Sequence, residues 1–188
     1  MRIIAGAFKG RRVQAPTWPG LRPTSDRLRE TLFNLLATRV DGARVVDGFA
    51  GTGAVGIEAL SRGAAHVTFI EQDRRAVTLI ARNLVLPGLE GRYTIERGDV
   101  AAVLRRRFGP AFDLILLDPP YDHAGIGDLL LAASARVRPE GLVILERATR
   151  REPEIPPALV RVRDVRAGDS TLTLLAPRAG ATGPPEPS

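Results

Sequence analysis

The stretch that decides the fold reads ARVVDGFAGTGAVG and covers residues 43–56. Its apolar start, residues 43–47, is typical of a buried parallel strand. Gly51, Gly53 and Gly56 then follow with the spacing G-x-G-x-x-G, which lets the chain turn tightly and lets a ligand approach the backbone at a helix start. A strand, a glycine-rich loop and a helix in this order predict an α/β fold.

The alternation of strands and helices continues along the chain. We expect further strands over residues 66–71, 93–97, 112–118 and 142–146, and helices over 54–62, 74–86, 100–107 and 125–137. Two late β-rich runs, 159–165 and 170–175, are separated by Ala167-Gly168-Asp169 and predict a closing hairpin. The predicted fold is therefore a Rossmann-like, mostly parallel sheet with helices on both faces and an antiparallel final strand.

The chain begins with a different pattern. Residues 2–13 predict a short β-hairpin in which Gly6 and Gly10 occupy turn or bulge positions. A loop rich in proline and glycine leads to a helix expected from about 25 to 39. We expect an N-terminal extension of residues 1–24, a single domain of 25–176 and a disordered tail of 177–188, which lacks an apolar pattern.

Composition limits the classes of function. The 188 residues contain no cysteine, which excludes disulfides and thiolate metal sites, and only two histidines, which argues against a histidine metal site. No run is long enough to span a bilayer and no secretory pattern is present, so we expect a cytoplasmic protein. We also expect it to act as a monomer. The net charge of +6 favours an anionic partner such as nucleic acid, although heavy arginine use can also reflect codon bias.

Acidic residues end the first three predicted strands. Asp47 precedes the glycines, Glu71 lies twenty residues after Gly51, and Asp99 follows the third strand. Glu71 can accept hydrogen bonds from a ribose diol, and Asp99 from an adenine amine. Asp47 and Asp99 could instead cap helices, and Glu71 could be an exposed strand end. Their joint placement indicates a cofactor that contains a nucleoside.

The glycine loop leaves two cofactors open. Its spacing fits the dinucleotide fingerprint literally, so a NAD oxidoreductase is a real alternative. An anion at Asp47, however, suits a cationic ligand better than a pyrophosphate. S-adenosylmethionine carries an ammonium and a sulfonium and has no phosphate.

The fourth strand ends in Asp118-Pro119-Pro120-Tyr121. The prolines have a fixed φ and donate no hydrogen bond, so they stiffen the turn and leave carbonyls pointing outward. The carboxylate, these carbonyls and the tyrosine ring can together hold a planar group with an exocyclic amine, as in a nucleobase. The alternative is an ordinary turn after a strand.

Taken together, these motifs resemble the bacterial 16S ribosomal RNA guanine-N2 methyltransferases of the guanine-966 type, which are class I S-adenosylmethionine-dependent methyltransferases. The resemblance covers residues 2 to about 175 and is most specific in LRPTSDRLRETLFN, residues 21–34. It continues in DGFAGTG (47–53), EALSRGA (58–64), IEQD (70–73) and DPPY (118–121). An aromatic residue that the family often has after the last strand is missing here, and the tail after Pro177 lies outside the pattern.

The resemblance implies a seven-stranded sheet, S-adenosylmethionine as methyl donor with S-adenosylhomocysteine as product, and no metal. The target would be the N2 amine of a guanine in 16S ribosomal RNA, possibly within an assembling small subunit. The residues implied to hold the guanine are Asp118, Pro119, Pro120 and Tyr121. The residues implied to bind the cofactor are Asp47, Phe49, Ala50, Gly51, Gly53, Glu71, Gln72, Asp99, Val100 and Asp118.

Basic residues near the N-terminus are the expected phosphate contacts, although each could be a solvated surface charge. They are Lys9, Arg11, Arg12, Arg22, Arg27 and Arg29. Three competing functions remain: a DNA amine methyltransferase, a NAD oxidoreductase and a non-catalytic RNA-binding module. The first shares the chemistry of Asp118 but usually needs a target-recognition domain, for which the chain has little room.

Overall fold

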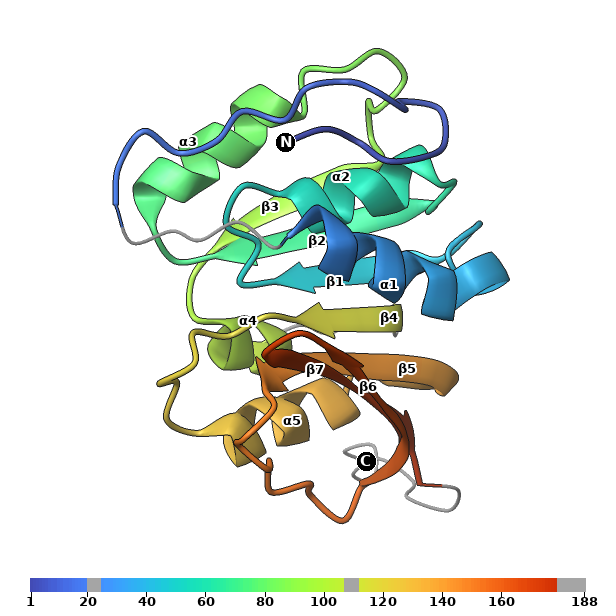
Figure 1. The fold of residues 1–188 in the computed structure, drawn as a ribbon, viewed down its shortest axis with the longest axis vertical. Coiled ribbons are helices and arrows are strands. Elements are labelled where there is room, and N and C mark those ends of the chain that lie inside the picture. The colour runs from blue at the N-terminus through green and yellow to red at the C-terminus, as the bar shows by residue number, and fades with distance from the viewer. Residues whose placement is uncertain (20–24, 107–111, 179–188) are drawn as a thin grey trace, which may run out of the picture.

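The computed structural model describes residues 1–19, 25–106 and 112–178, which form one seven-stranded sheet covered by helices (Figure 1). The strands are β1 (Arg44–Gly48), β2 (His66–Glu71), β3 (Tyr93–Arg97), β4 (Phe112–Leu117), β5 (Val137–Ala148), β6 (Leu159–Ala167) and β7 (Ser170–Pro177). The helices are α1 (Asp26–Leu36), the 3₁₀ turn η1 (Ala37–Arg39), α2 (Ala54–Ser61), α3 (Arg74–Asn83), α4 (Val100–Arg106) and α5 (Ile126–Ser134).

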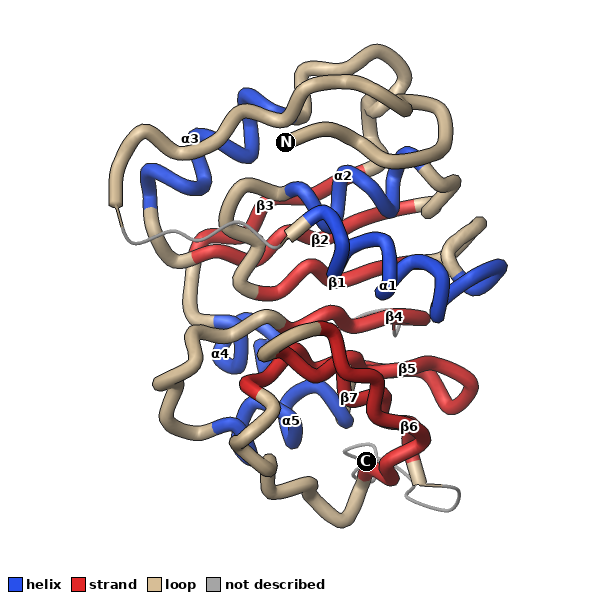
Figure 2. The backbone as a smooth tube through the Cα atoms, in the orientation of Figure 1, coloured by secondary structure: helices blue, strands red, loops and turns tan. Residues whose placement is uncertain are grey.

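The strand order is β3-β2-β1-β4-β5-β7-β6, and Figure 2 shows these strands as one continuous row. β1 to β5 are parallel, whereas β7 runs antiparallel to both β5 and β6. The predicted fold class is therefore confirmed. The order reverses between β1 and β4, which is where ligands bind in open α/β sheets.

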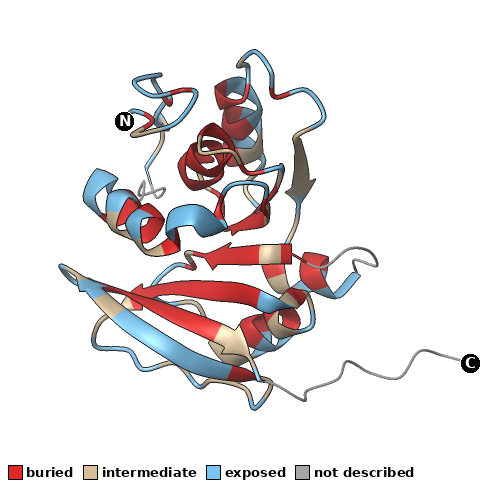
Figure 3. Ribbon diagram, turned by 90° about the vertical axis from the view of Figure 1, so that its right-hand side faces the viewer, coloured by how far each residue is buried: buried red, intermediate tan, exposed pale blue. Residues whose placement is uncertain are grey.

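Two hydrophobic cores lie on opposite faces of the sheet. Successive strand residues point to opposite faces, so Val45 packs into the first core and Val46 into the second. The first core lies under α1, α2, α3 and the N-terminal segment; the second lies under α4 and α5. In Figure 3 the buried residues fill the central strands and α2, whereas the edge strand β6 is exposed along most of its length.

Most predicted element boundaries lie within a few residues of those in the structure. The strand expected over 142–146 is longer, because β5 begins at Val137, which pairs with Phe112 across a shift in register. The helix expected to reach residue 39 ends at Leu36. Ala37 has a φ of 44°, which breaks the α-helical path before η1. The tail predicted to be disordered lies outside the described residues from position 179 onward.

The predicted N-terminal hairpin is reduced to one antiparallel bridge between Arg2 and Arg12. Gly6 lies in its turn with a φ of 81°, in the left-handed region that favours glycine. A Cβ atom on Gly6 would stand 1.8 Å from the carbonyl oxygen of Ser61, so this position packs directly on α2. Figure 1 shows the segment, in dark blue, crossing above α2 and α3.

The extension is fastened to α2 by two side chains. The Glu58 carboxylate accepts hydrogen bonds from the backbone N–H of Ile4 (2.8 Å) and of Ala5 (3.0 Å). The Ser61 hydroxyl accepts from the N–H of Phe8 and donates to the carbonyl of Ala5. The block EALSRGA, singled out in the sequence, therefore contains the anchor of the N-terminal segment.

Glu58 also pairs with two arginines. Its carboxylate lies 2.8 Å from Nε of Arg62 and 3.7 Å from Nη1 of Arg29, and the side chains of Glu58 and Arg29 are wholly buried. Arg29 also donates to the carbonyl of Arg2 and to Asp26. One buried carboxylate thus joins the extension, α1 and α2.

We expect Glu58→Ala to lower the free energy of unfolding by about 3–5 kcal/mol, because it removes one of the two carboxylates that pair with the buried Arg29 and leaves two backbone N–H groups without their acceptor. Urea denaturation would measure the change. The control is Glu30→Ala on the exposed side of α1, which should change stability by no more than about 0.5 kcal/mol. A loss of under about 1 kcal/mol for Glu58→Ala would show that the anchor is dispensable.

Candidate active site

Four acidic side chains come to one face of the sheet at the carboxyl ends of neighbouring strands. They are Glu71 of β2, Asp47 of β1, Asp118 directly after β4, and Glu146 of β5. Each of these acids follows a strand residue of the first core by an even number of positions. Because alternate residues of a strand point to the same face of the sheet, all four side chains face α1 and the N-terminal segment. Strand register alone therefore builds an acidic row.

A cavity of about 510 Å³ opens over this row. Its floor is the glycine loop, and its walls come from the first turn of α1, the loop after β2 and the loop after β4. Of the predicted site residues, the following line it: Phe49, Ala50, Gly51, Glu71, Gln72, Asp118, Pro119, Pro120 and Tyr121. The structure thus brings the glycine loop and the Asp-Pro-Pro-Tyr turn to one space.

Asp47 lies beneath the cavity and is almost completely buried. Its carboxylate accepts a hydrogen bond of 2.8 Å from the N–H of Gly56, in the first turn of α2. Burial raises the pKa of Asp47 to about 8, and the nearby charges of Asp118 and Glu71 act in the same direction. A cation bound in the cavity would oppose this shift and favour the ionised form.

Glu71 shapes the loop that it faces. Its carboxylate accepts from the N–H of Gly51 (2.9 Å) and from the N–H of Asp73 (2.8 Å). Phe49 directly follows β1 at the start of the glycine loop. It has a φ of 62°, which is uncommon for a residue other than glycine. Its ring meets the ring of His123 edge to face, with centroids 5.2 Å apart.

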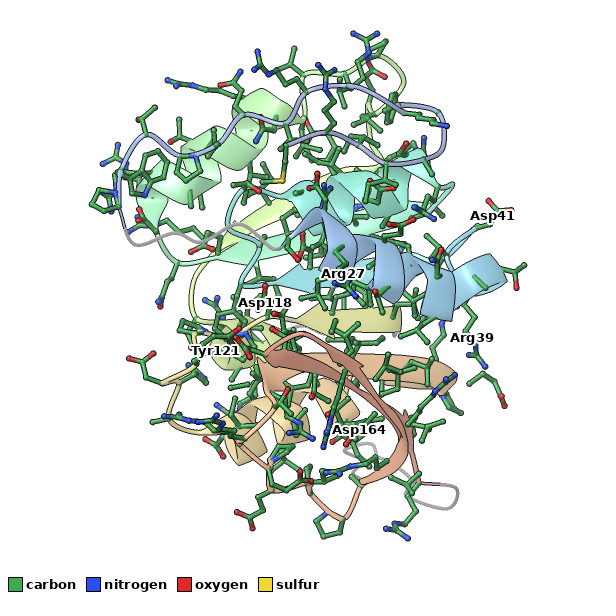
Figure 4. The ribbon with its side chains drawn as sticks, viewed as in Figure 1. Arg27, Arg39, Asp41, Asp118, Tyr121 and Asp164 are labelled. Carbon is green, nitrogen blue, oxygen red and sulfur yellow. The ribbon has the colours of Figure 1, made fainter. Side chains whose placement is uncertain are left out.

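The Asp118-Pro119-Pro120-Tyr121 turn is held at both ends. The N–H of Asp118 donates to the carbonyl of Gly48 on β1 (3.3 Å), and the N–H of His123 donates to the carbonyl of Pro120 (2.8 Å). The side chain of Asp118 is half-buried, while Tyr121 is 45% exposed and lines the cavity. Arg151 donates to the carbonyl of Tyr121. Figure 4 shows Asp118 and Tyr121 close together.

Sequence reasoning missed several residues of this cavity. Trp18 lines it from the extension, with the guanidinium of Arg75 5.2 Å from its ring centroid. Glu146 and Ser170 line it from β5 and β7. A signal for Glu146 was present, because it is an acid at the end of a predicted strand, as Glu71 is. Trp18 carried no comparable signal within its irregular loop.

Four predicted cofactor residues lie outside the cavity lining: Asp47, Gly53, Asp99 and Val100. The exposed Asp99 carboxylate accepts a hydrogen bond from the N–H of Ala102 (2.8 Å) and so caps α4. Helix capping was the alternative to adenine binding that the sequence left open for this residue. The Val100 side chain is buried in the second core. Gly53 does not line the cavity but closes its loop through a hydrogen bond of 2.7 Å to the carbonyl of Ala50.

The basic residues predicted to contact RNA are not gathered around the cavity. Lys9, Arg11 and Arg12 are exposed beside the carboxyl end of α2, whereas the cavity adjoins its amino end, about 12 Å away along 8 residues. Arg27 is exposed on the first turn of α1, on the side toward Asp118 (Figure 4). Arg22 lies outside the described residues.

The prediction for Arg29 as a phosphate contact is wrong. Its side chain is wholly buried, and its guanidinium is held by Asp26, by Glu58 and by the carbonyl of Arg2. The sequence placed it on the surface because a basic residue in a helix start usually faces solvent. Here the N-terminal segment covers that face of α1.

Within residues 1–19, 25–106 and 112–178, no group of three or more acidic or histidine side chains is placed to hold a metal ion. No helix in the same ranges has the length and apolar character needed to cross a bilayer.

Comparison with known proteins shows the family. Residues 1–176 match the family described as "Conserved hypothetical protein 95". The chain belongs to this family. It is 38% identical over 148 residues to the Ribosomal RNA small subunit methyltransferase D of Escherichia coli, covering 78% of this chain and 74% of that protein. The protein of the same name from Haemophilus influenzae is 36% identical over 151 residues, covering 78% of each chain.

A solved structure agrees in fold. The yhhF protein of Escherichia coli superposes with a TM-score of 0.83 at 31% identity, over 95% of this chain and 98% of that one. The fold is that of class I methyltransferases, and these relatives confirm the resemblance to small-subunit ribosomal RNA methyltransferases that the motifs indicated.

The raised pKa of Asp47 predicts a pH-dependent stability. Between pH 3.8, the usual pKa, and pH 8, the folded chain keeps a proton that the unfolded chain releases. Stability should therefore fall as the pH rises through this window. Asp47→Asn, which cannot ionise, should melt progressively higher than the unsubstituted protein as the pH rises from 5 to about 8. Melting temperatures of the ligand-free proteins would measure this.

The control for this measurement is Asp122→Asn, since Asp122 is exposed. The difference in melting temperature between Asp122→Asn and the unsubstituted protein should be the same at every pH. If the difference between Asp47→Asn and the unsubstituted protein does not change with pH, Asp47 is not the titrating group.

Proposed function

We propose that this chain transfers a methyl group from S-adenosylmethionine to the exocyclic N2 amine of a guanine in 16S ribosomal RNA. The observation that carries the proposal is the placement of the Asp118-Pro119-Pro120-Tyr121 turn beside the glycine loop in one cavity. Strand register supports it, because Gly48 of β1 pairs with Leu117 of β4. The next residues, Phe49 and Asp118, therefore leave the sheet side by side.

The donor set of the cavity fits S-adenosylmethionine. Asp47, Glu71 and Asp118 give it a negative potential that suits an ammonium and a sulfonium, while a dinucleotide would bring a pyrophosphate toward the same carboxyl groups. We assign Glu71 to the ribose hydroxyls, the loop of residues 47–53 to the methionine portion, and Asp99 to the adenine amine, with Gln72 and Val100 beside them. When bound, this cofactor supplies an electrophilic methyl group.

The chain's own residues would prepare the amine. The lone pair of a guanine N2 amine is delocalised into the ring, which makes the amine a poor nucleophile. The Asp118 carboxylate and the Pro119 carbonyl can accept its two hydrogens and favour a more tetrahedral nitrogen. This stabilisation grows as the new bond forms, so it lowers the barrier. Stacking on Tyr121 would contribute about 1–3 kcal/mol to holding the base.

The cavity admits a base only after it leaves its stack, so the RNA must present the guanine splayed out. We propose that Lys9, Arg11, Arg12 and Arg27 contact phosphates, with Arg22 as a further candidate in the segment that leads to α1. The substrate would be 16S ribosomal RNA in the cytoplasm, either free or within an assembling small subunit, and the enzyme would act as a monomer.

The central test is Asp118→Ala, which should still bind S-adenosylhomocysteine but lose methyl transfer to RNA by about 100-fold or more, because the amine loses its acceptor. Asp118→Asn keeps one acceptor oxygen and should retain more activity. Asp122→Ala, an exposed neighbour, is the control. Activity would be measured by mass mapping of guanines in ribosomal RNA from cells that lack the protein, with each variant added back.

Two outcomes would contradict the proposal. One is an Asp118→Ala variant that transfers methyl groups at the unsubstituted rate. The other is calorimetry that shows NAD binding and no S-adenosylhomocysteine binding, which would make the chain an oxidoreductase.

The proposed RNA surface makes a separate prediction. The double variant Arg11→Ala/Arg12→Ala should weaken RNA binding and reduce the dependence of log K on log salt by about 1–2, since two phosphate contacts are lost. Arg105→Ala/Arg106→Ala is matched, because it also removes two adjacent exposed arginines, but from α4 on the opposite face. Equal salt slopes for the two double variants would remove the extension from the interface.

A further inference from the structure

Glu146 is the acid of the cavity that the proposed function leaves without a role. Leu117 of β4 pairs with Leu145 of β5, so Asp118 and Glu146 stand next to each other on neighbouring strands. Glu146 is 9% exposed, yet it lines the cavity together with Asp118 and Tyr121. Burying a carboxylate at this depth is unfavourable unless it is hydrogen-bonded.

Ser170 ties Glu146 to the stacking ring. The Ser170 hydroxyl donates to Oε1 of Glu146 (3.0 Å) and lies 3.0 Å from the hydroxyl of Tyr121. A serine hydroxyl has a single hydrogen, which here goes to the carboxylate, so Tyr121 is the donor in the second bond. The chain Tyr121–Ser170–Glu146 therefore fixes the ring and the carboxylate in one geometry.

The position of Glu146 across the sheet assigns it to the base rather than to the cofactor. The strand order places Glu71 of β2 and the glycine loop of β1 on one side of Asp118 and Glu146 of β5 on the other. If the cofactor lies over β1 and β2, the space between Asp118, Tyr121 and Glu146 is left for the target base.

The chemistry of the bases gives this carboxylate a purpose. Asp118, the prolines and Tyr121 can hold any planar amine, so they do not distinguish guanine from adenine or cytosine. Guanine has an N1–H donor next to its N2 amine. In adenine and in cytosine the ring nitrogen next to the amine is an acceptor, whose lone pair would face the second carboxylate. The two oxygens of a carboxylate together offer about four acceptor sites, so one carboxylate can accept from several donors at once.

We propose that Glu146 is the residue that makes the site specific for guanine, by accepting the N1–H of the base whose N2 amine is held by Asp118. This inference rests on the proposed function and deepens it. Glu146 forms no covalent bond and takes no proton in the reaction. Ser170 positions it and keeps it at a fixed distance from the ring of Tyr121.

The test replaces the target guanine, once mapped, by 2-aminopurine, which keeps the amine but lacks the N1–H. The substrates would be ribosomal RNA and small subunits reconstituted on it. The unsubstituted protein should methylate guanine roughly 10- to 100-fold faster than 2-aminopurine. Glu146→Gln should methylate guanine more slowly than the unsubstituted protein. It should also lower the ratio of the guanine rate to the 2-aminopurine rate by about 10-fold, because the glutamine amide can donate a hydrogen bond to the unprotonated N1 of 2-aminopurine.

The matched control is Glu140→Gln, an exposed glutamate on the same strand, which should keep the unsubstituted rates and ratio. Calorimetry with S-adenosylhomocysteine should give the same affinity for Glu146→Gln as for the unsubstituted protein. A variant that loses this affinity would place Glu146 on the cofactor and overturn the inference. A variant that is slower with both bases at an unchanged ratio would make its role purely structural, which also overturns it.

The comparison of guanine with 2-aminopurine in the unsubstituted protein tests the inference even if the variant does not fold. If it methylates 2-aminopurine as fast as guanine, no group reads the N1–H and the inference is wrong, whereas the proposed methyl transfer stands. If it transfers no methyl group to either base, the proposed function fails and takes the inference with it. The proposed function and the inference are both supported if the unsubstituted protein prefers guanine to 2-aminopurine and this preference decreases in Glu146→Gln but not in Glu140→Gln.

Discussion

The buried carboxylate of Glu58 is the contact on which the shape of the site depends. It accepts hydrogen bonds from the backbone of the N-terminal segment and pairs with Arg29 of α1 and Arg62 at the end of α2. A wholly buried carboxylate is unfavourable unless such donors form hydrogen bonds and ion pairs with it. Because three segments converge on this group, α1 and the extension cover the same sheet face and supply one wall of the cavity.

The second constraint is the register of the parallel strands. It brings Glu71, Asp47, Asp118 and Glu146 to one face, and it leaves an acidic cavity in a chain whose net charge is +6. The two signs suit different kinds of ligand. Burial raises the pKa of Asp47, and the neighbouring charges of Asp118 and Glu71 add to the shift, so a cationic ligand inside would be favoured. Exposed arginines outside favour a polyanion. Separating the charges in space lets one small domain accommodate both.

The β/α alternation and its strand ends could be read from the sequence because they rest on local chemistry. Apolar runs such as FDLILL and glycine turns act within a few residues. The failures have the opposite character. The sequence predicted Arg29 to be a surface cation. In the structure it is covered by a segment that lies 27 residues earlier in the chain. The expected hairpin keeps a single bridge between Arg2 and Arg12, while the N–H groups of Ile4 and Phe8 donate to Glu58 and Ser61 of α2. Trp18 gained its place in the cavity only through the path of the extension.

The sequence by itself determined the fold class, the glycine loop, the acids that end the strands and the family, since each is encoded in a short stretch whose conformation depends on its own residues. The tertiary structure alone decided which of these acids meet and what surrounds them. It set Glu146 beside Asp118, joined it through Ser170 to Tyr121, and moved Arg29 from the expected RNA surface into the interior. The physical reason is that burial, pKa and hydrogen-bond partners depend on packing between segments far apart in the chain, which no local pattern specifies.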